Sequence, residues 1–454
     1  MSDIHQYDYL EHASGQFIRT DFPDGRIIQS KKFGLNPNRL CYEVTNNQDD
    51  FKLTIGYYIG VDWLIENHSS IIVAPKLNSR IDAIRREANL NDDIELDQEM
   101  PIDYSAGENL SIDYFAILNQ CLNSEYLYRE IDDLVHINWV SAEVPINQSQ
   151  DWLTPLIIVK FLNILKIIVR KGLKKSYYKI SQNLNSKIKG KILVGQNIKQ
   201  NIAKNRFTHT TCQYEDFGID SLENRLLKKA FVFATTYLEN HKKAFYSTDN
   251  HFNNVINFCR PAFELVGFEL NIFEVKNHKA NPFFREYNEA IYLAKLLLRR
   301  FSYSLSNIAK EKITTPPYWI DMPKLFELYA YHFLKRRFSN SAKEVYYHVS
   351  TYGNELDFLI KTDHIKMVVD AKYKPLYVYG INHQDIRQVS GYSRLNKVYT
   401  ELDIKDDSLI DCLIIYPDVQ KGLNEIDFNS VDLKNNPVRG YRNIYKVGIK
   451  IPVK

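Results

Sequence analysis

The chain has 454 residues, which is too long for one ordinary domain, so two or three domains are expected. Hydrophobic residues make up 44% and charged residues 25%, a globular composition that argues against extensive disorder. The formal net charge is only +3, so any affinity for nucleic acid has to come from local basic patches. The five cysteines form no CxxC pair, which argues against a zinc site or a disulfide framework and favours a reducing compartment.

The N-terminus, MSDIHQYDYLEH, has neither the basic start nor the apolar core of a signal peptide. The longest apolar stretch, residues 156–169, is interrupted by Lys160 and Lys166 and is too short to span a bilayer. We therefore expect a soluble, cytoplasmic protein that makes no contact with a membrane.

Residues 1–110 have the pattern of short strands separated by turns. The segments FKLTIGYYIGVDWL and SSIIVAPKL are rich in β-branched and aromatic residues, and Gly56, Gly60 and Pro75 punctuate them. This pattern predicts a β-rich N-terminal domain. The acidic segment NDDIELDQEMPIDYSAGENL follows, and it is interpreted as a solvated loop or linker.

Residues 111–312 predict a mostly helical and basic middle region. Apolar residues recur at a spacing of three to four in WLTPLIIVKFLNILKIIVRKG and SLENRLLKKAFVFATTYLENHKKAF. Between Trp152 and Tyr214 there is no Asp or Glu, whereas Lys and Arg recur throughout. Such a block can follow a phosphate backbone. It can equally be a solvated, lysine-rich helix face, and both interpretations stay open.

Residues 313–454 predict a C-terminal α/β domain with a central mixed sheet. After the breaker in ITTPPYW come a helix, MPKLFELYAYHFLKRRF, then two strand-like runs and a second helix, INHQDIRQVSGYSRLNKVY. Two further strands, SLIDCLIIYP and NIYKVGIKIPV, complete the order. The fold class expected for the whole chain is therefore multi-domain α+β.

The two strand-like runs of residues 355–374 each carry an acid where an apolar side chain is expected. If they pair as antiparallel strands about residues 363–364, the numbers of facing residues sum to 727, so Asp357 lies opposite Asp370. Facing residues have Cβ atoms about 4.5–5.5 Å apart. Asp370 and Lys372 point to the same face. Two carboxylates this close repel each other unless a cation lies between them, and Mg²⁺ commonly takes one or two carboxylates together with waters and phosphate oxygens.

Hydrolysis of a phosphodiester needs a Lewis acid, a nucleophilic water and neutralisation of the charge on the phosphate. Lys372 beside such a metal can orient or deprotonate the water, or neutralise the phosphate. A D-x12-D-x-K string also arises by chance, however, and the same pairing places Glu355 opposite Lys372 as a simple ion pair. A metal-dependent nuclease centre and a surface hairpin therefore both remain open from these residues alone.

Two neighbouring features bear on this choice. Glu327 lies in a mostly apolar predicted helix, where it either reaches the metal from the inner face or lies on the solvent side. Gln388 and Tyr392 have the i, i+4 spacing that places them on one helix face. An amide and a phenol at this spacing can orient a nucleic-acid strand or the catalytic lysine.

These residues resemble the PD-(D/E)xK nuclease superfamily and, more specifically, the McrC family, the nuclease subunit of McrBC-type modification-dependent restriction systems. The motif matches at the first acid, the D-x-K, the QxxxY and the helix acid, which are Asp357, Asp370, Lys372, Gln388, Tyr392 and Glu327. The blocks YYIGVDWLIENHSSIIVAPKL and IKGKILVGQNIKQN with TCQYEDFGIDSLENRLLKKAF are similar to the amino-terminal and central patterns of the family. Leu356 departs from the superfamily, which has Pro before the first acid.

The resemblance implies that Mg²⁺ or Mn²⁺ is bound by three carboxylates, those of Asp357, Asp370 and Glu327. It also implies that three further side chains complete the catalytic set, namely Lys372, Gln388 and Tyr392. It also implies an McrB-like AAA+ GTPase ring as partner and DNA, methylated or otherwise modified, as substrate. The chain has no G-x-x-x-x-G-K-[ST] P-loop, so GTP would act only through the partner. By analogy, residues 59–76 belong to the partner-facing half.

The function expected is therefore a metal-dependent DNA endonuclease subunit of a GTP-driven restriction complex that stimulates the GTPase of its AAA+ partner. One alternative is a non-enzymatic adaptor or activator of an AAA+ motor, in which the carboxylates are vestigial; the intact D…D-x-K argues against it. The other alternative is a stand-alone DNA repair nuclease, which would cut without any nucleotide.

Overall fold

The structure is a computed structural model of the whole chain, and its backbone is described over much of the sequence. The described residues are 4–10, 14–18, 28–33, 39–46, 50–74, 91–96, 116–117, 120–121, 134–138, 140–147, 151–240, 251–270, 285–306, 312–338, 344–351, 353–426, 428 and 437–452. Most of the acidic segment, from residue 97 on, lies outside them, as do Pro75 and Lys76 of the predicted partner-facing stretch.

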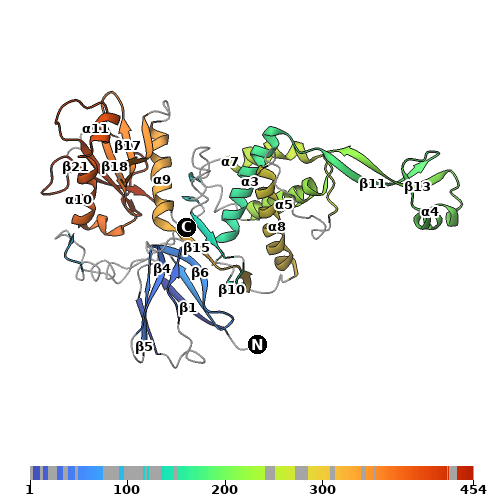
Figure 1. Cartoon of the computed structure of the whole chain (residues 1–454), viewed down its shortest axis with the longest axis horizontal. Coiled ribbons are helices and arrows are strands. Elements are labelled where there is room, and N and C mark those ends of the chain that lie inside the picture. Colours follow the sequence, from blue (N-terminus) through green and yellow to red (C-terminus); the bar gives the residue numbers. More distant parts are fainter. Residues whose placement is uncertain are drawn as a thin grey trace. The chain divides into compact units, whose positions relative to one another are not determined.

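The chain forms two compact units (Figure 1). One unit combines the N-terminal residues 1–152 with the C-terminal residues 314–454, and the other comprises residues 153–313. Several β-sheets and helices are present, so the expected mixed α and β architecture is confirmed. The division into three domains at residues 110 and 312 stays a prediction.

The N-terminal part of the first unit is rich in β-strands. A four-stranded sheet has the order β2-β5-β4-β3, with bounds Ser14–Ile18, Asp50–Ile55, Leu40–Asn46 and Lys31–Lys32. A five-stranded sheet has the order β1-β7-β6-β15-β9, with bounds His5–Leu10, Ser69–Ala74, Tyr58–Ile65, Tyr318–Asp321 and Val135–Ile137. Every residue of β6 is buried, which fits its nearly continuous apolar sequence.

Strand β15 comes from the C-terminal part of the sequence but lies between β6 and β9. Its Trp319 packs in the apolar core of the N-terminal sheets and donates a hydrogen bond from Nε1 to Oδ2 of the buried Asp62, at 2.9 Å. The next helix, α9 (Met322–Arg337), follows directly, and the side chain of Asp321 accepts a hydrogen bond from the backbone N–H of Lys324 as its N-cap. The N-terminal sheet thus fixes where α9 begins.

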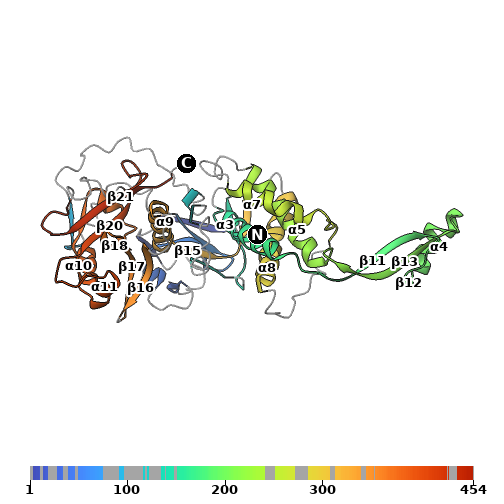
Figure 2. The same cartoon turned by 90° about the horizontal axis from the view of Figure 1, so that it is seen from above.

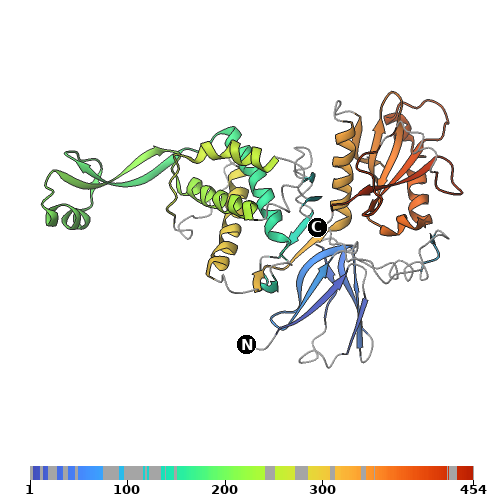
Figure 3. The same cartoon turned by 180° about the vertical axis from the view of Figure 1, so that it is seen from behind.

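The C-terminal part of the first unit is built on a mixed five-stranded sheet. Its order is β16-β17-β18-β20-β21, with bounds Val345–Thr351, Asn354–Lys361, Lys366–Ala371, Asp411–Asp418 and Ile444–Lys450. The first three strands are antiparallel, and β18, β20 and β21 are parallel. The sheet lies between α9 and α10 (His383–Tyr392), as Figures 1 and 3 show, and the short helix α11 (Asn396–Glu401) follows.

The register of the β17–β18 hairpin agrees with the sequence prediction. Four pairs run from Phe358 opposite Val369 to Lys361 opposite Lys366, and the numbers of every pair sum to 727. The turn is closed by the backbone N–H of Thr362, which donates to the carbonyl of Ile365 at 2.8 Å. The predicted pairing is therefore confirmed.

The acidic segment is not only a solvated loop. Its residues Ile94–Leu96 form strand β8, which pairs antiparallel with β19 (Gly380–Asn382). The backbones approach so closely that a Cβ atom on Gly380 would lie 2.2 Å from the carbonyl oxygen of Glu95. The loop interpretation is wrong for these three residues because Ile94 and Leu96 pack on the apolar core of the C-terminal sheet.

The second unit combines helices with a long two-stranded arm. The helices are α3 (Leu153–Lys171), α5 (Leu222–Asn240), α7 (His251–Cys259) and α8 (Arg285–Ser306). The arm is formed by β11 (Ser176–Asn185) and β13 (His209–Gly218), and carries the short β12 (Lys191–Ile192) and α4 (Val194–Gln200) at its end. Figure 2 shows this arm extending away from the helices of its own unit.

The basic block identified in the sequence covers helix α3 and, from Ser176 on, most of the arm. The prediction of helix is wrong for β11 and β13, where partly buried and exposed residues alternate in the first half of β11 as in a two-sided strand. α3, which contains the longest apolar stretch, is a buried helix of its unit. Among the described helices, none is long and apolar enough to cross a membrane.

Candidate functional site

Asp357 and Asp370 lie at the end of the β17–β18 ladder. The last paired residues are Phe358 and Val369, so the same register places the two aspartates opposite each other one step further. Asp357 Oδ2 accepts a hydrogen bond from the backbone N–H of Ala371, at 2.8 Å, which fixes it against β18. Asp370 is only 2% exposed. The structure thus brings the two predicted acids together, with Asp370 buried and Asp357 half-buried.

Lys372 joins this pair to helix α10. Its Nζ lies 2.9 Å from Asp370 Oδ2 and donates a hydrogen bond to Gln388 Oε1, also at 2.9 Å. Gln388 Nε2 in turn lies 2.7 Å from the hydroxyl of Tyr392. The D-x-K lysine and both residues of the QxxxY pattern therefore form one connected row that begins at Asp370.

The competing ion pair between Glu355 and Lys372 is not formed. Oε1 of Glu355 lies 3.4 Å from Nδ1 of His348, whereas the ammonium of Lys372 forms an ion pair with Asp370 and a hydrogen bond with Gln388. A simple cross-strand ion pair therefore does not explain why the lysine occurs in this hairpin.

The two aspartates are held in an environment that disfavours their charged forms. Burial, followed by the charges of Asp370 and Glu327, raises the pKa of Asp357 well above its ordinary value. Burial also raises the pKa of Asp370, although Lys372 counteracts it. Burial by itself would lower the pKa of Lys372, but the surrounding carboxylates, Asp370 first, raise it, so this side chain is a cation.

The donor set fits a divalent cation. Asp370 Oδ2 is buried and makes no hydrogen bond of acceptable geometry, although it lies beside the Lys372 ammonium. A buried carboxylate oxygen that accepts no hydrogen bond can still coordinate a cation. Next to a second carboxylate of raised pKa, it suits a cation that takes oxygen ligands. Within the described ranges, no three His, Cys, Asp or Glu side chains are grouped closely enough to hold a metal ion together. The fit therefore rests on two aspartates, a number that Mg²⁺ accepts when waters and phosphates fill its other positions.

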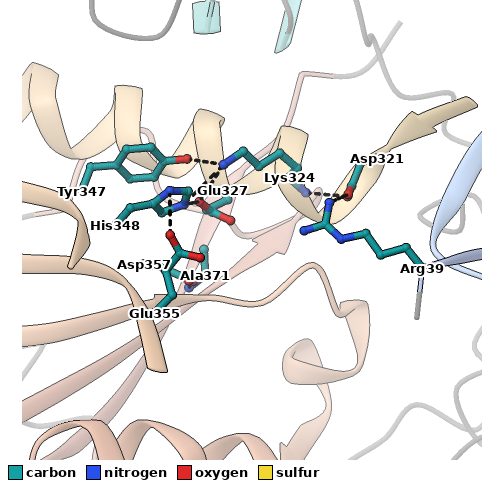
Figure 4. A network of polar contacts seen from close by, with 9 residues as sticks. All are labelled: Arg39, Asp321, Lys324, Glu327, Tyr347, His348, Glu355, Asp357 and Ala371. Atoms are coloured by element: carbon teal, nitrogen blue, oxygen red, sulfur yellow. Dashed lines mark hydrogen bonds and ion pairs between the residues drawn. The ribbon is translucent and has the colours of Figure 1, made fainter. Parts of the chain in front are cut away.

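Glu327 points inward from helix α9. Its side chain is 16% exposed, and Oε1 lies 2.5 Å from Nε2 of His348 (Figure 4). Burial would raise the pKa of Glu327, but the hydrogen bond from His348 and the charge of Lys324 hold it below its ordinary value. Of the two orientations left open by the sequence, the structure shows the inner one. Glu327 is close enough to Asp357 for its charge to raise the pKa of that aspartate.

Two groups beside the site were missed from the sequence. Asp385 of α10 accepts hydrogen bonds from Lys374 Nζ, at 2.9 and 2.8 Å, and from the hydroxyl of Tyr377, at 2.8 Å. The second lysine of D-A-K-Y-K was the available signal for this cluster. His348 is the other group, and a histidine inside an aromatic strand carries no periodicity that marks it.

The family-like central block stabilises the base of the arm. Arg225 Nε and Nη2 donate two hydrogen bonds to Asp220, at 2.8 and 2.6 Å, and the same carboxylate accepts from the backbone N–H of Gly267, at 2.7 Å. The buried Asn224 donates to the carbonyls of Lys174, at 2.9 Å, and Ile219, at 2.7 Å, which flank β11 and β13. In this block the polar residues therefore have a structural role.

Comparison with known proteins shows to which family the chain belongs. A family model described as "McrBC 5-methylcytosine restriction system component" matches residues 64–417. No curated protein matches the chain.

Two solved structures are similar at low identity. One is a half-complex from the tetradecameric assembly of Thermococcus gammatolerans McrB AAA+ hexamers with bound McrC; the match has 14% identity and a TM-score of 0.37, and covers 98% of this chain and 94% of that chain. The other is the Thermococcus gammatolerans McrBC complex, with 13% identity and a TM-score of 0.26, covering 73% of this chain and 88% of that chain. Because the family model spans more than half of the sequence, the resemblance is confirmed: the chain belongs to the McrBC 5-methylcytosine restriction system component family.

Proposed function

We propose that this chain is a McrC-type, metal-dependent DNA endonuclease subunit whose C-terminal sheet is a PD-(D/E)xK nuclease fold. The observation that supports the proposal is a pair of facing acids, Asp370 buried and Asp357 half-buried, with a lysine beside them. Asp357 and Asp370 face each other at the end of the ladder, and the Lys372 ammonium lies 2.9 Å from Asp370. A structural hairpin gains nothing from burying two carboxylates side by side, because like charges directly opposite each other destabilise a sheet.

Asp357 and Asp370 would hold Mg²⁺ or Mn²⁺, with Glu327 beside them, and the metal would supply a Lewis acid and an activated water. The Lys372 ammonium, 2.9 Å from Asp370, would donate to the phosphate and neutralise its charge. Gln388 holds the lysine by its amide oxygen, and Tyr392 holds the Gln388 amide in turn. This row fixes the direction of the ammonium before DNA arrives.

We further propose that the chain works with an McrB-like AAA+ GTPase ring and cleaves methylated or otherwise modified DNA. Family membership supports this, since the family description names a 5-methylcytosine restriction system. In the similar Thermococcus gammatolerans assembly, McrC is bound to McrB AAA+ hexamers. The sequence has no P-loop, so GTP would be bound and hydrolysed by the partner, with this chain stimulating the reaction. The exposed basic arm stays a candidate for contact with DNA.

The test is cleavage of methylated DNA by the full chain with its AAA+ partner, GTP and Mg²⁺. Asp370→Ala and Lys372→Ala should each abolish cleavage while leaving complex formation intact. Asp363→Asn is the matched control, because this acid lies exposed in the turn of the same hairpin. Cleavage that survives Asp370→Ala would refute the assignment. GTPase stimulation without metal-dependent cleavage would favour the adaptor, and cleavage without nucleotide would favour a stand-alone nuclease.

A further inference from the structure

His348 has an unusual backbone conformation for a strand residue. It lies within β16, yet its φ is +53°, in the left-handed region that a residue with a Cβ atom rarely adopts. On either side the β16–β17 ladder is regular, with Tyr347 opposite Phe358 and Val349 opposite Leu356. The pair between them is absent, and it would be formed by His348 and Asp357. The ladder is therefore interrupted at the first acid of the site.

This conformation turns the imidazole toward helix α9. Successive side chains of a strand normally point to opposite faces. Here the rings of Tyr347 and His348 are stacked, with centroids 3.8 Å apart and an interplanar angle of 22°. Tyr347 also stacks on Tyr331 of α9, with centroids 4.7 Å apart. The strain at His348 thus brings its ring to the helix that carries Glu327.

The imidazole then contacts two carboxylates from different elements (Figure 4). Its Nε2 lies 2.5 Å from Glu327 Oε1, on α9, and its Nδ1 lies 3.4 Å from Glu355 Oε1, on β17. Lys324 Nζ lies 2.9 Å from the Tyr347 hydroxyl, 3.3 Å from His348 Nε2 and 3.7 Å from the same Glu327 oxygen. Because a carboxylate only accepts, the short contact to Glu327 is a hydrogen bond in the tautomer that carries a proton on Nε2.

We propose that His348 is a positioning residue that holds the Glu327 carboxylate near Asp357, and thereby strengthens the binding of a divalent cation at the aspartate pair. Strained backbone persists where surrounding contacts over-determine it, and it clusters at functional sites. Partners that orient the acids around a metal typically account for 10- to 100-fold in affinity. The inference rests on the proposed function, because it assumes a cation at the aspartate pair.

The experiment is a titration of the full chain with Mn²⁺ in the absence of DNA, followed by calorimetry. His348→Gly removes the ring while keeping the left-handed backbone accessible, so thermal unfolding should show a folded protein. We expect its Mn²⁺ affinity to fall about 10- to 100-fold. His348→Asn, which tolerates the same backbone and retains a donor, should recover part of this loss. His364→Asn, in the exposed hairpin turn, is the matched control and should bind as the wild type does.

A double-mutant cycle with Glu327→Gln tests whether His348 acts through Glu327. If it does, adding His348→Gly to Glu327→Gln causes no further loss of Mn²⁺ affinity. Wild-type affinity in His348→Gly, or losses that simply add in the double variant, would overturn the inference. The proposed function is tested separately by Asp370→Asn: if Mn²⁺ binding does not depend on Asp370, the metal site itself is wrong and the inference falls with it.

Discussion

Replacing Asp357 by Asn should stabilise the protein in the absence of metal while destroying its metal response. Facing residues at this position have Cβ atoms about 5 Å apart. Two unit charges at about 5 Å repel by roughly 3 kcal/mol at an effective dielectric constant of about 20. Lys372 offsets part of this repulsion. We therefore expect Asp357→Asn to raise the free energy of unfolding by about 1–2 kcal/mol at neutral pH.

The increase in the free energy of unfolding caused by Asp357→Asn should become smaller as the pH falls. Because folding raises the pKa of Asp357, the unfolded chain loses this proton first, so the carboxyl increasingly destabilises the folded state as the pH rises from the unfolded to the folded pKa. As the pH falls, the wild-type carboxyl takes up a proton and comes to resemble the Asn side chain. The difference between variant and wild type should therefore shrink, and vanish near the ordinary aspartate pKa of about 3.9.

The assay is thermal unfolding in chelator, repeated with added Mg²⁺. We expect Mg²⁺ to raise the melting temperature of the wild type but not that of Asp357→Asn, since ligands that bind only the folded state stabilise it. Asp363→Asn, from the same hairpin, should behave as the wild type in both conditions. The reasoning is refuted if Asp357→Asn is less stable than the wild type in chelator, or if Mg²⁺ stabilises both equally.

Three further changes test separate parts of the structure. Gln388→Ala frees the Lys372 ammonium from its amide partner, so kcat should fall roughly tenfold with the fold intact; unchanged single-turnover cleavage would contradict this. Asn224→Ala removes the hydrogen bonds of a buried amide to two partly buried carbonyls at the base of the arm and should cost about 1–3 kcal/mol in urea unfolding, whereas a neutral result would contradict the structural role of that block. Gly380→Ala should expose the β8 amides to hydrogen exchange, because its Cβ would lie 2.2 Å from a carbonyl oxygen. Gly391→Ala, with nothing within 4 Å, is its control, and equal exchange in both would contradict the predicted clash.

Pairings close in sequence could be predicted, and pairings distant in sequence could not. The β17–β18 register follows from a four-residue connection and the two-residue period of the strands, which leave few alternatives. Strand β15 lies in the N-terminal sheet more than 240 residues after its neighbour β6, and β8 joins β19 across a similar separation. Nothing within Tyr318–Asp321 or Ile94–Leu96 identifies the partner strand, because pairing of this kind depends on which apolar faces meet.

The basic arm illustrates a different difficulty. Its strands β11 and β13 alternate polar and apolar residues only over short runs, so periodicity does not distinguish them from the amphipathic helices on either side. β11 and β13 are strands rather than helices because they pair with each other, from Ser176 opposite Gly218 to Asn185 opposite His209. This pairing cannot be predicted from either segment taken alone.

At the candidate site, the sequence by itself determined that Asp357, Asp370 and Lys372 come together, because local strand geometry places them on one hairpin. Only the tertiary structure decided that Glu327 points inward, because that depends on where β15 starts helix α9. It alone also showed His348 beside Glu327, since a left-handed residue within a strand is sustained by contacts from α9 and β17 rather than by its own preference.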